Sequence, residues 1–213
     1  MPSADLTSPL DAGDFAPWVT AMRQAVRGER DSDVPCGDCT ACCRSAQFIH
    51  IAPDERDTLA HIPAELLFPA PRMPKGHVLM GYDEQGACPM LVDDTCTIYA
   101  HRPRTCRTYD CRVLPAAGVE LSPDDAKPMI ATQAVRWRFS HPAPVDEALH
   151  AAVSAAAHHL VAHRSELPSE AVPPTTTHLA VAAVMIHHVF LDDAGKVRVP
   201  PADEVVVALR HGP

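Results

Sequence analysis

Cys36-Gly-Asp-Cys39-Thr-Ala-Cys42-Cys43 is the stretch of this sequence on which every other inference depends, because it places four thiols within a few residues. The thiolate form of cysteine binds soft and borderline metal ions, and cysteines two residues apart bring their sulfurs close enough to share one ion. Four more cysteines follow, and none lies elsewhere in the chain: Cys88, Cys96, Cys106 and Cys111. We therefore predict that all eight are metal ligands.

The spacing of these cysteines favours zinc and an iron-sulfur cluster about equally. A C-x2-C pair followed by a second pair further along, here Cys106-x4-Cys111, is typical of zinc modules. Three cysteines at the step Cys36-x2-Cys39-x2-Cys42 are instead typical of the first ligands of a bacterial iron-sulfur cube. Since neighbouring residues do not easily face the same ion, we expect Cys42 and Cys43 to serve two sites or to bridge two metals.

A disulfide framework is the main alternative to metal ligation, and the start of the chain argues against it. The segment MPSADLTSPLDAGDF is polar and acidic, and it lacks the basic start and apolar stretch of a secretory signal. We therefore expect a cytoplasmic protein, in which thiols stay reduced. At 213 residues, the chain is also long enough to bury a core without disulfides.

The composition argues against two classes of partner. An apolar share of 46% with 21% charged residues is typical of a globular soluble protein. The net charge of -9 disfavours nucleic acid, because phosphate binding needs a basic surface. The longest apolar run, about residues 179–190, is shorter than the ~20 residues that a bilayer requires. We expect metal ions as partners, and neither nucleic acid nor a membrane.

The hydrophobic pattern predicts an α+β protein, with a small irregular metal-organised cysteine domain of short strands flanked by amphipathic helices. We place an N-terminal tail and helix in residues 1–33, the metal-binding domain in 34–118, and a helical and β-hairpin extension packed on it in 119–213. Val205 to Val207 fit either a final strand or a short helix. The other predicted elements are helices over 14–26, 53–61 and 144–167, an apolar segment capped by Thr175 to Thr177, strands over 46–51 and 77–82, and a turn at 192–195 that leads into a returning strand.

The second half of the cysteine region carries a specific motif. It runs Gly86-Ala-Cys88-Pro-Met-Leu91 and then Asp94-Thr-Cys96-Thr-Ile-Tyr99-Ala-His-Arg102-Pro-Arg-Thr-Cys106-Arg107-Thr-Tyr109-Asp-Cys111. Together with the first cluster, it resembles the CxxCxxCC cysteine-cluster proteins, also called YkgJ-like, which are described as a zinc- or iron-chelating domain. The resemblance covers about residues 34–114, includes all eight cysteines and implies metal chelation.

The charged and aromatic residues of this motif have two interpretations. A four-thiolate zinc site carries a formal charge of about -2, as does a typical iron-sulfur cube, and four arginines beside the thiols can offset it: Arg102, Arg104, Arg107 and Arg112. Alternatively, Arg102 and Arg107 hold an anionic cofactor or substrate together with Tyr99 and Tyr109. Three nearby histidines could replace a thiol but are not required, and the last is the best placed of them: His50, His77 and His101.

Three functions follow from these observations. The leading one is a metal-binding protein whose cysteines chelate zinc or an iron-sulfur cluster, so that the metal organises the fold. The resemblance extends to modules of flagellin lysine N-methylases, which implies a metal- or cluster-dependent enzyme of group transfer, such as methyl transfer, or of redox chemistry. The sequence has no glycine-rich nucleotide loop and no recognisable catalytic set to support that alternative. The third is a protein that passes zinc or iron on to others.

Overall fold

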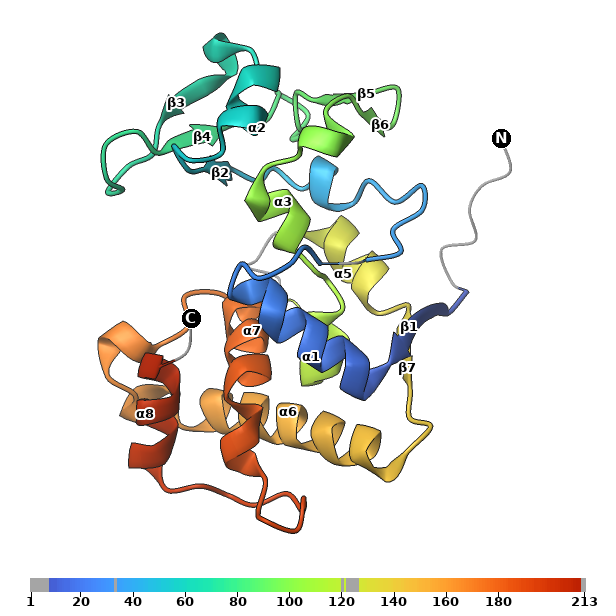
Figure 1. Cartoon of the computed structure of the whole chain (residues 1–213), viewed down its shortest axis with the longest axis vertical. Helices are drawn as coiled ribbons and strands as arrows, with labels where there is room; N and C mark the ends of the chain where they lie inside the picture. Colours follow the sequence, from blue (N-terminus) through green and yellow to red (C-terminus); the bar gives the residue numbers. More distant parts are fainter. Residues whose placement is uncertain (1–7, 33, 120, 122–126, 212–213) are drawn as a thin grey trace. The chain divides into compact units, whose positions relative to one another are not determined.

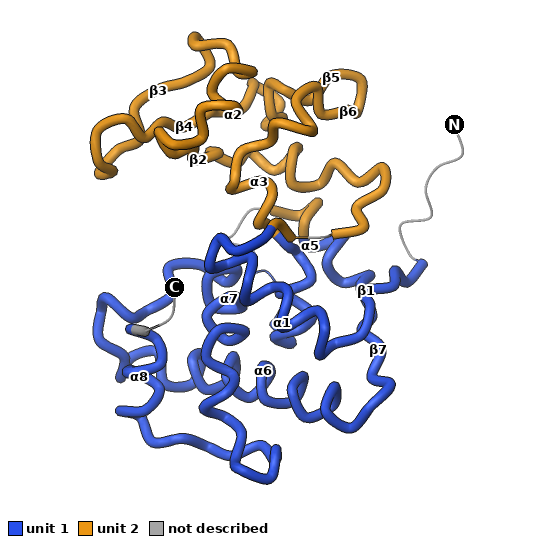
Figure 2. Tube along the Cα trace, viewed as in Figure 1, with its two compact units in different colours: residues 1–30, 110–126, 131–213 blue, residues 31–109, 127–130 orange. Residues whose placement is uncertain are grey.

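A computed structural model describes residues 8–32, 34–119, 121 and 127–211. Within them the chain divides into two compact units, which Figures 1 and 2 show. Unit 1 is assembled from residues 1–30, 110–126 and 131–213, and unit 2 from residues 31–109 and 127–130. Helices predominate and the strands are short and lie in small sheets, which confirms the predicted α+β class.

Unit 2 is built on a three-stranded antiparallel sheet in the order β2-β4-β3. The central strand pairs with both neighbours, so that Leu79 lies opposite His50 on one side and Phe68 on the other. The buried core beside the sheet is small, and Cys88 and Cys96 pack against it. Its fully buried members are Ile51, Ile62, Met80 and Ile98.

Short helices and a two-stranded hairpin complete unit 2. The strands are β2 (Ile49–Ile51), β3 (Leu67–Pro69), β4 (Val78–Met80), β5 (Leu91–Val92) and β6 (Thr95–Cys96). The helices are η1 (Cys42–Arg44), α2 (Arg56–His61), η2 (Ala64–Leu66), η3 (Tyr99–His101) and α3 (Arg104–Thr108). A further helix, α5 (Pro128–Ala134), is divided, because its residues up to Ile130 belong to unit 2 and the rest to unit 1.

Unit 1 begins with β1 (Leu10–Asp14), which pairs in parallel with the distant strand β7 (Trp137–Ser140). α1 (Phe15–Val26) follows β1 directly, and Gly28, just beyond its end, has the positive φ of 73° that glycine accepts without strain. An aromatic cluster lies where α1 meets β7, with Phe15 and Trp18 both in contact with Phe139.

Long alanine-rich helices form the rest of unit 1. α6 and α7 pack against each other, and both helices contribute completely buried alanines: Ala152, Ala156, Ala180 and Ala183. The remaining elements are α4 (Val113–Ala117), α6 (Pro144–Ala162), η5 (Arg164–Glu166), η6 (Ser169–Ala171), α7 (Thr176–Ile186), η7 (His187–Phe190) and α8 (Ala202–His211). Over the described residues, none of the helices has the length and apolarity needed to cross a membrane.

Most predicted elements are present, with shifted ends. The helix expected from Pro53 begins only at Arg56, because the buried carboxylate of Glu55 accepts hydrogen bonds from the backbone of Ala52 and Arg104 and holds the preceding residues in a turn. Thr175 caps α7 as predicted, by accepting from His178 N–H. The expected strand after the turn at 192–195 is reduced to one bridge between Leu191 and Val197.

Candidate metal centre

The first cysteine pair lies in a tight turn at the start of unit 2. The Cys39 N–H donates to the carbonyl of Cys36 over 2.9 Å, and Gly37 between them has a φ of 54°. This left-handed conformation favours glycine, which has no Cβ to clash. The turn leads into η1, which carries the next two cysteines, Cys42 and Cys43.

The next three cysteines come from a loop, a hairpin and a helix of unit 2. The Cys88 N–H donates to the Cys43 carbonyl over 2.7 Å, which ties the second group to the first. Cys96 lies in the β5–β6 hairpin opposite Leu91, and Cys106 lies in α3. All three thiols are half-buried. The fold of unit 2 thus gathers cysteines that are far apart in sequence.

Cys42 and Cys43 are in contact, with their Sγ atoms 4.0 Å apart. Their hydrogen bond lowers the pKa of Cys42 to about 7 and raises the pKa of Cys43. The pair therefore carries one proton and one negative charge above neutral pH. A thiolate of this kind is the form of cysteine that binds a metal ion.

The charges of five thiols of unit 2 act on one another, although no three of the sulfurs of these described residues lie within 4.8 Å of one another. Burial raises the pKa of Cys106 to about 12, and the charges of Cys42, Cys88 and Cys96 act in the same direction. Burial likewise raises the pKa of Cys88, with added effects from Cys96 and Cys42. None of the eight cysteines, all within the described part of the chain, forms a disulfide bond. Half-buried thiols without disulfides are a donor set that fits zinc or iron.

Cys111 is the one predicted ligand outside unit 2. It follows Asp110 at the start of the second segment of unit 1 and is half-buried there. Its Sγ accepts a hydrogen bond from the indole Nε1–H of Trp137 over 3.2 Å. Trp137 is a residue that sequence reasoning missed, because it lies 26 positions away and only the fold brings it to the thiol.

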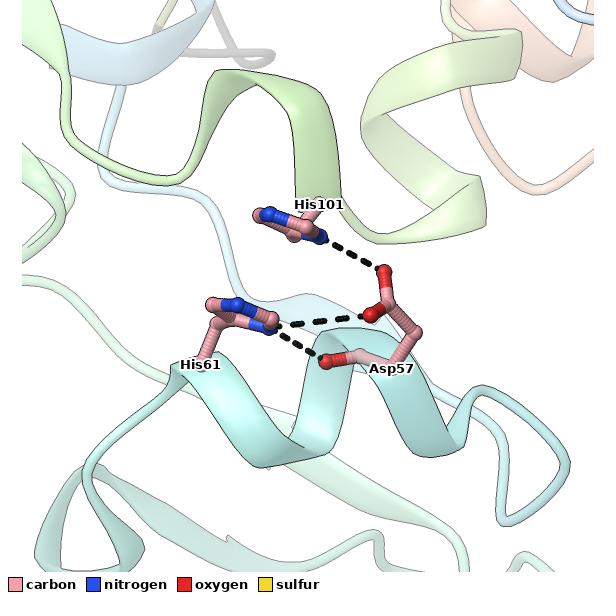
Figure 3. A group of neighbouring side chains, drawn as sticks. All are labelled: Asp57, His61 and His101. Carbon is pink, nitrogen blue, oxygen red and sulfur yellow. Dashed lines mark hydrogen bonds and ion pairs between the residues drawn. The ribbon is translucent and has the colours of Figure 1, made fainter.

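The three histidines considered as substitute ligands contact other residues. His50 and His77 hydrogen-bond to each other over 2.8 Å. The Nδ1 atom of His101 lies 2.7 Å from a carboxylate oxygen of Asp57, beside His61 (Figure 3). This nitrogen therefore faces a carboxylate. Asp57 and His61 were not singled out in the sequence, although their spacing of four on a predicted helix was a signal that they share a face.

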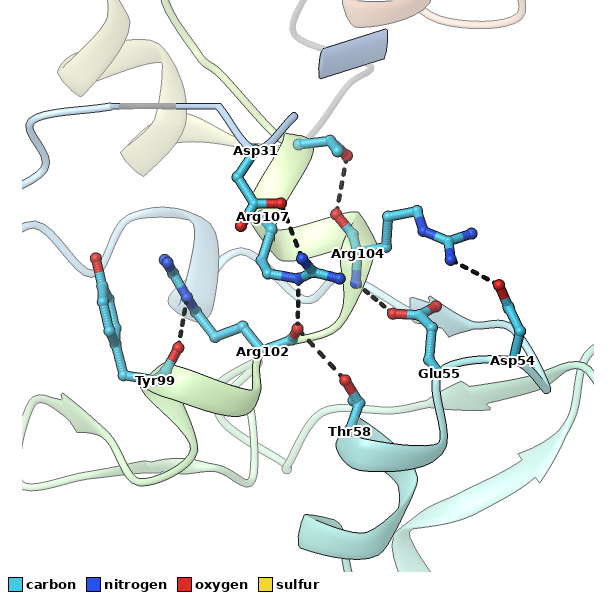
Figure 4. Close-up of polar contacts among 9 residues, drawn as sticks. Asp31, Asp54, Glu55, Thr58, Tyr99, Arg102, Arg104 and Arg107 are labelled. Carbon is cyan, nitrogen blue, oxygen red and sulfur yellow. Dashed lines mark hydrogen bonds and ion pairs between the residues drawn. The ribbon is translucent and has the colours of Figure 1, made fainter. Parts of the chain in front are cut away.

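The arginines of the motif hold loops together through carboxylates and carbonyls (Figure 4). Arg107 pairs with Asp31 over 2.8 Å and also donates to the carbonyl of Arg102, while Arg104 pairs with Asp54. These contacts occupy Arg107 within the polypeptide. Its predicted role in holding a cofactor stays a prediction.

Arg102 is different, because its charge acts on the thiols. Its guanidinium stacks over the ring of Tyr99 at 3.6 Å from the centroid, and its Nε donates to the Tyr99 carbonyl. The largest effect on the pKa of Cys42 is its hydrogen bond with Cys43, and the largest effect on the pKa of Cys106 is burial. The positive charge of Arg102 has a smaller effect and lowers the pKa of both thiols. Tyr99 is 61% exposed, whereas Tyr109 is only partly exposed and its hydroxyl oxygen is buried.

Comparison with protein families decides what the cysteine region is. Residues 35–134 match the family model CxxCxxCC, described as "Putative zinc- or iron-chelating domain". Residues 35–134 belong to the CxxCxxCC family. This confirms the resemblance inferred from the motifs, and the CxxCxxCC match extends to the end of α5. No curated protein and no solved structure matches the chain.

The CxxCxxCC assignment supports metal binding and agrees with the thiol chemistry described above. The matched residues 35–134 include all eight cysteines, among them Cys111 of unit 1. Its description leaves open whether the metal is zinc or iron.

Proposed function

We propose that the CxxCxxCC domain chelates zinc through its thiols and that the bound ion organises the fold of unit 2. The supporting observation is the 4.0 Å distance between the Sγ atoms of Cys42 and Cys43. Two thiolates bound to one zinc ion at about 2.3 Å in tetrahedral geometry lie about 3.8 Å apart. This spacing supports one shared ion, whereas the sequence alone led us to expect that the two cysteines serve two sites or bridge two metals.

An iron-sulfur cube fits this pair less well. Each iron of a cube takes one cysteine, so the cysteine sulfurs around the cluster point outward and lie farther apart than on a single ion. Cys88 and Cys106 are the two further ligands proposed from unit 2, because their charges act on Cys43 and four thiols complete one tetrahedral site. Cys96, whose charge acts on Cys88 and Cys106, is a further candidate ligand. Cys36, Cys39 and Cys111 stay candidate ligands from the sequence.

The ion is expected to stabilise the fold because unit 2 has little else to hold it. Its core of buried side chains is small, and two of the thiols pack against that core. Zinc bound to cysteine sites contributes about 10 to 16 kcal/mol, which is comparable with the whole stability of an ordinary domain at about 5 to 15 kcal/mol. Metal binding and folding of unit 2 would then be one process.

Anaerobic purification followed by elemental analysis and a visible absorption spectrum tests the identity of the metal. We expect zinc and a colourless protein, and we expect the double variant Cys42→Ser with Cys43→Ser to lose metal. Arg44→Gln is the matched control, because Arg44 is the next residue and its guanidinium pairs with the exposed Asp94. Iron with a broad visible band would instead identify a cluster.

Removal of the metal under reducing conditions tests the structural role. In hydrogen exchange, we expect the amides of β2, β4 and α3 to lose protection when the ion is chelated, while those of α6 and α7 in unit 1 keep theirs. Equal protection of β2 and β4 with and without metal would contradict the structural role while leaving chelation intact.

A further inference from the structure

A second group of metal-ligating side chains lies in unit 2, apart from the thiols. Asp57 and His61 are one turn apart on α2, and His101 comes from η3, which packs against α2. The carboxylate and the two imidazoles each offer a ligand atom, and these three atoms lie within 4.8 Å of one another. Figure 3 shows the two rings one above the other, with Asp57 along one edge.

The hydrogen bonds fix which ring atoms face Asp57. His61 Nδ1 lies 2.8 Å from the backbone carbonyl of Asp57, so this nitrogen carries the proton that it donates. The same nitrogen is 3.8 Å from one carboxylate oxygen, and His101 Nδ1 is 2.7 Å from the other. Both Nδ1 atoms therefore converge on one carboxylate from two segments that are 44 residues apart.

The distances are close to those that one ion requires. A zinc ion bound at about 2.0 to 2.2 Å to imidazole nitrogen and carboxylate oxygen separates neighbouring ligand atoms by about 3.3 to 3.6 Å in tetrahedral geometry. The separations of 2.7 and 3.8 Å lie on either side of this value. Small movements of exposed side chains are enough to equalise them.

We propose that Asp57, His61 and His101 form a second metal site, which takes a borderline divalent ion such as Zn²⁺ independently of the thiols. Imidazole and carboxylate are suitable ligands for such ions, whereas thiolates select the softer ones. Three protein ligands leave one tetrahedral position for water, so this site is open. The ion replaces the Nδ1 protons through which the two histidines hydrogen-bond to Asp57.

Exposure gives the ion access without opening the fold. The side chains of Asp57, His61 and His101 are 71%, 41% and 37% exposed. The imidazoles lie nearly parallel, with centroids 3.5 Å apart and planes 6° apart. Because a nitrogen lone pair lies in the plane of its ring, the rings must tilt toward a shared ion. Binding of one ion to both rings therefore requires them to leave this stacked arrangement.

Nuclear magnetic resonance of the histidine side chains tests the site directly. Zn²⁺ is added to the full-length protein after its thiols have been saturated with zinc. We expect the ring nitrogens of His61 and His101 to shift together and to saturate at about one further equivalent. His158, an exposed histidine of unit 1, is the internal control and should not respond. Unchanged His61 and His101 signals at millimolar Zn²⁺ would overturn the proposal.

Calorimetry of single variants supplies the second measurement. Replacement His61→Gln, His101→Gln or Asp57→Asn should weaken binding of the additional Zn²⁺ at least about tenfold. His158→Gln is the matched control, because it also removes one exposed imidazole. Equal affinity in all four variants would overturn the proposal. Because both measurements follow the histidines, they remain decisive even if the thiols prove to bind iron.

Discussion

The carboxylate of Asp110 and the guanidinium of Arg112 form an ion pair of 2.8 Å with only 1% and 8% of their side chains exposed. Asp110 also accepts a hydrogen bond from the indole Nε1–H of Trp18 over 3.0 Å, and Arg112 donates to the carbonyl of Ala12. This pair lies immediately beside Cys111 and connects α1, β1 and the start of α4 within unit 1.

Replacing Asp110 by alanine should destabilise unit 1 by about 3 to 5 kcal/mol, because it leaves a buried guanidinium without its carboxylate. Urea unfolding followed by tryptophan fluorescence measures the loss, since Trp18 reports on the site. Asp94→Ala, which removes the exposed partner of Arg44, should cost at most about 1 kcal/mol. Similar losses in both variants would contradict the assigned role of the buried pair.

Replacing Arg102 by glutamine should weaken metal binding by the thiols. A positive charge near thiolates contributes on the order of 1 kcal/mol when it is partly screened by solvent, which corresponds to about fivefold in affinity. Competition with a chelator of known affinity measures the change. Arg104→Gln is the control, because Arg104 pairs with the exposed Asp54 and should leave the affinity unchanged. An unaltered affinity in Arg102→Gln would show that Arg102 acts only through its stacking on Tyr99.

The stability of unit 1 should fall as the pH drops from about 6.5 to about 4, because of His187. Burial lowers the pKa of His187 to about 4, and its Nδ1–H donates to the Val184 carbonyl. Below about pH 6.5 the unfolded chain binds a proton that the folded chain does not, so acidification favours unfolding. The full effect is about 3 kcal/mol and is complete near the folded pKa.

Urea unfolding at several pH values measures this dependence. His187→Gln removes the titrating group, and its stability should change less between pH 7 and pH 4 than that of the natural chain. A variant that keeps the whole pH dependence would assign it to other groups.

Enlarging Ala156 should destabilise the contact between α6 and α7. This alanine is completely buried, and the opposing helix also presents buried alanines. Ala156→Leu forces extra methylenes into a filled space and should cost about 1 to 3 kcal/mol. Ala151→Leu adds the same side chain to an exposed position of α6 and should change the stability little. Thermal unfolding of the two variants distinguishes these outcomes.

Local patterns in the sequence predicted much of the fold. The period of apolar residues after Asp14 gave the helix α1, and Thr175 gave the start of α7, because both signals act within one or two turns. Val205 to Val207 were ambiguous because three valines fit a strand or a helix. The structure has a helix there, with Val205 buried and Val207 exposed.

Long-range relationships were not predictable from the same patterns. The parallel pairing of Leu10 with Trp137 leaves no local signal, since each strand is short and its partner is far away in sequence. The cysteine spacing identified the family, yet it did not indicate that His101 faces Asp57. That contact depends on how η3 packs against α2, which only the folded backbone determines.

The division of unit 1 into separate segments of chain has a consequence for its synthesis. Residues 31–109 leave the ribosome as one continuous stretch, so most of unit 2 can fold and bind the proposed ion while the rest is still being translated. In contrast, β1 is synthesised before unit 2 and cannot pair with β7 until more than a hundred further codons have been translated. The apolar face of α1, which packs against α6 and α7 in the folded chain, therefore stays uncovered until those helices have been made.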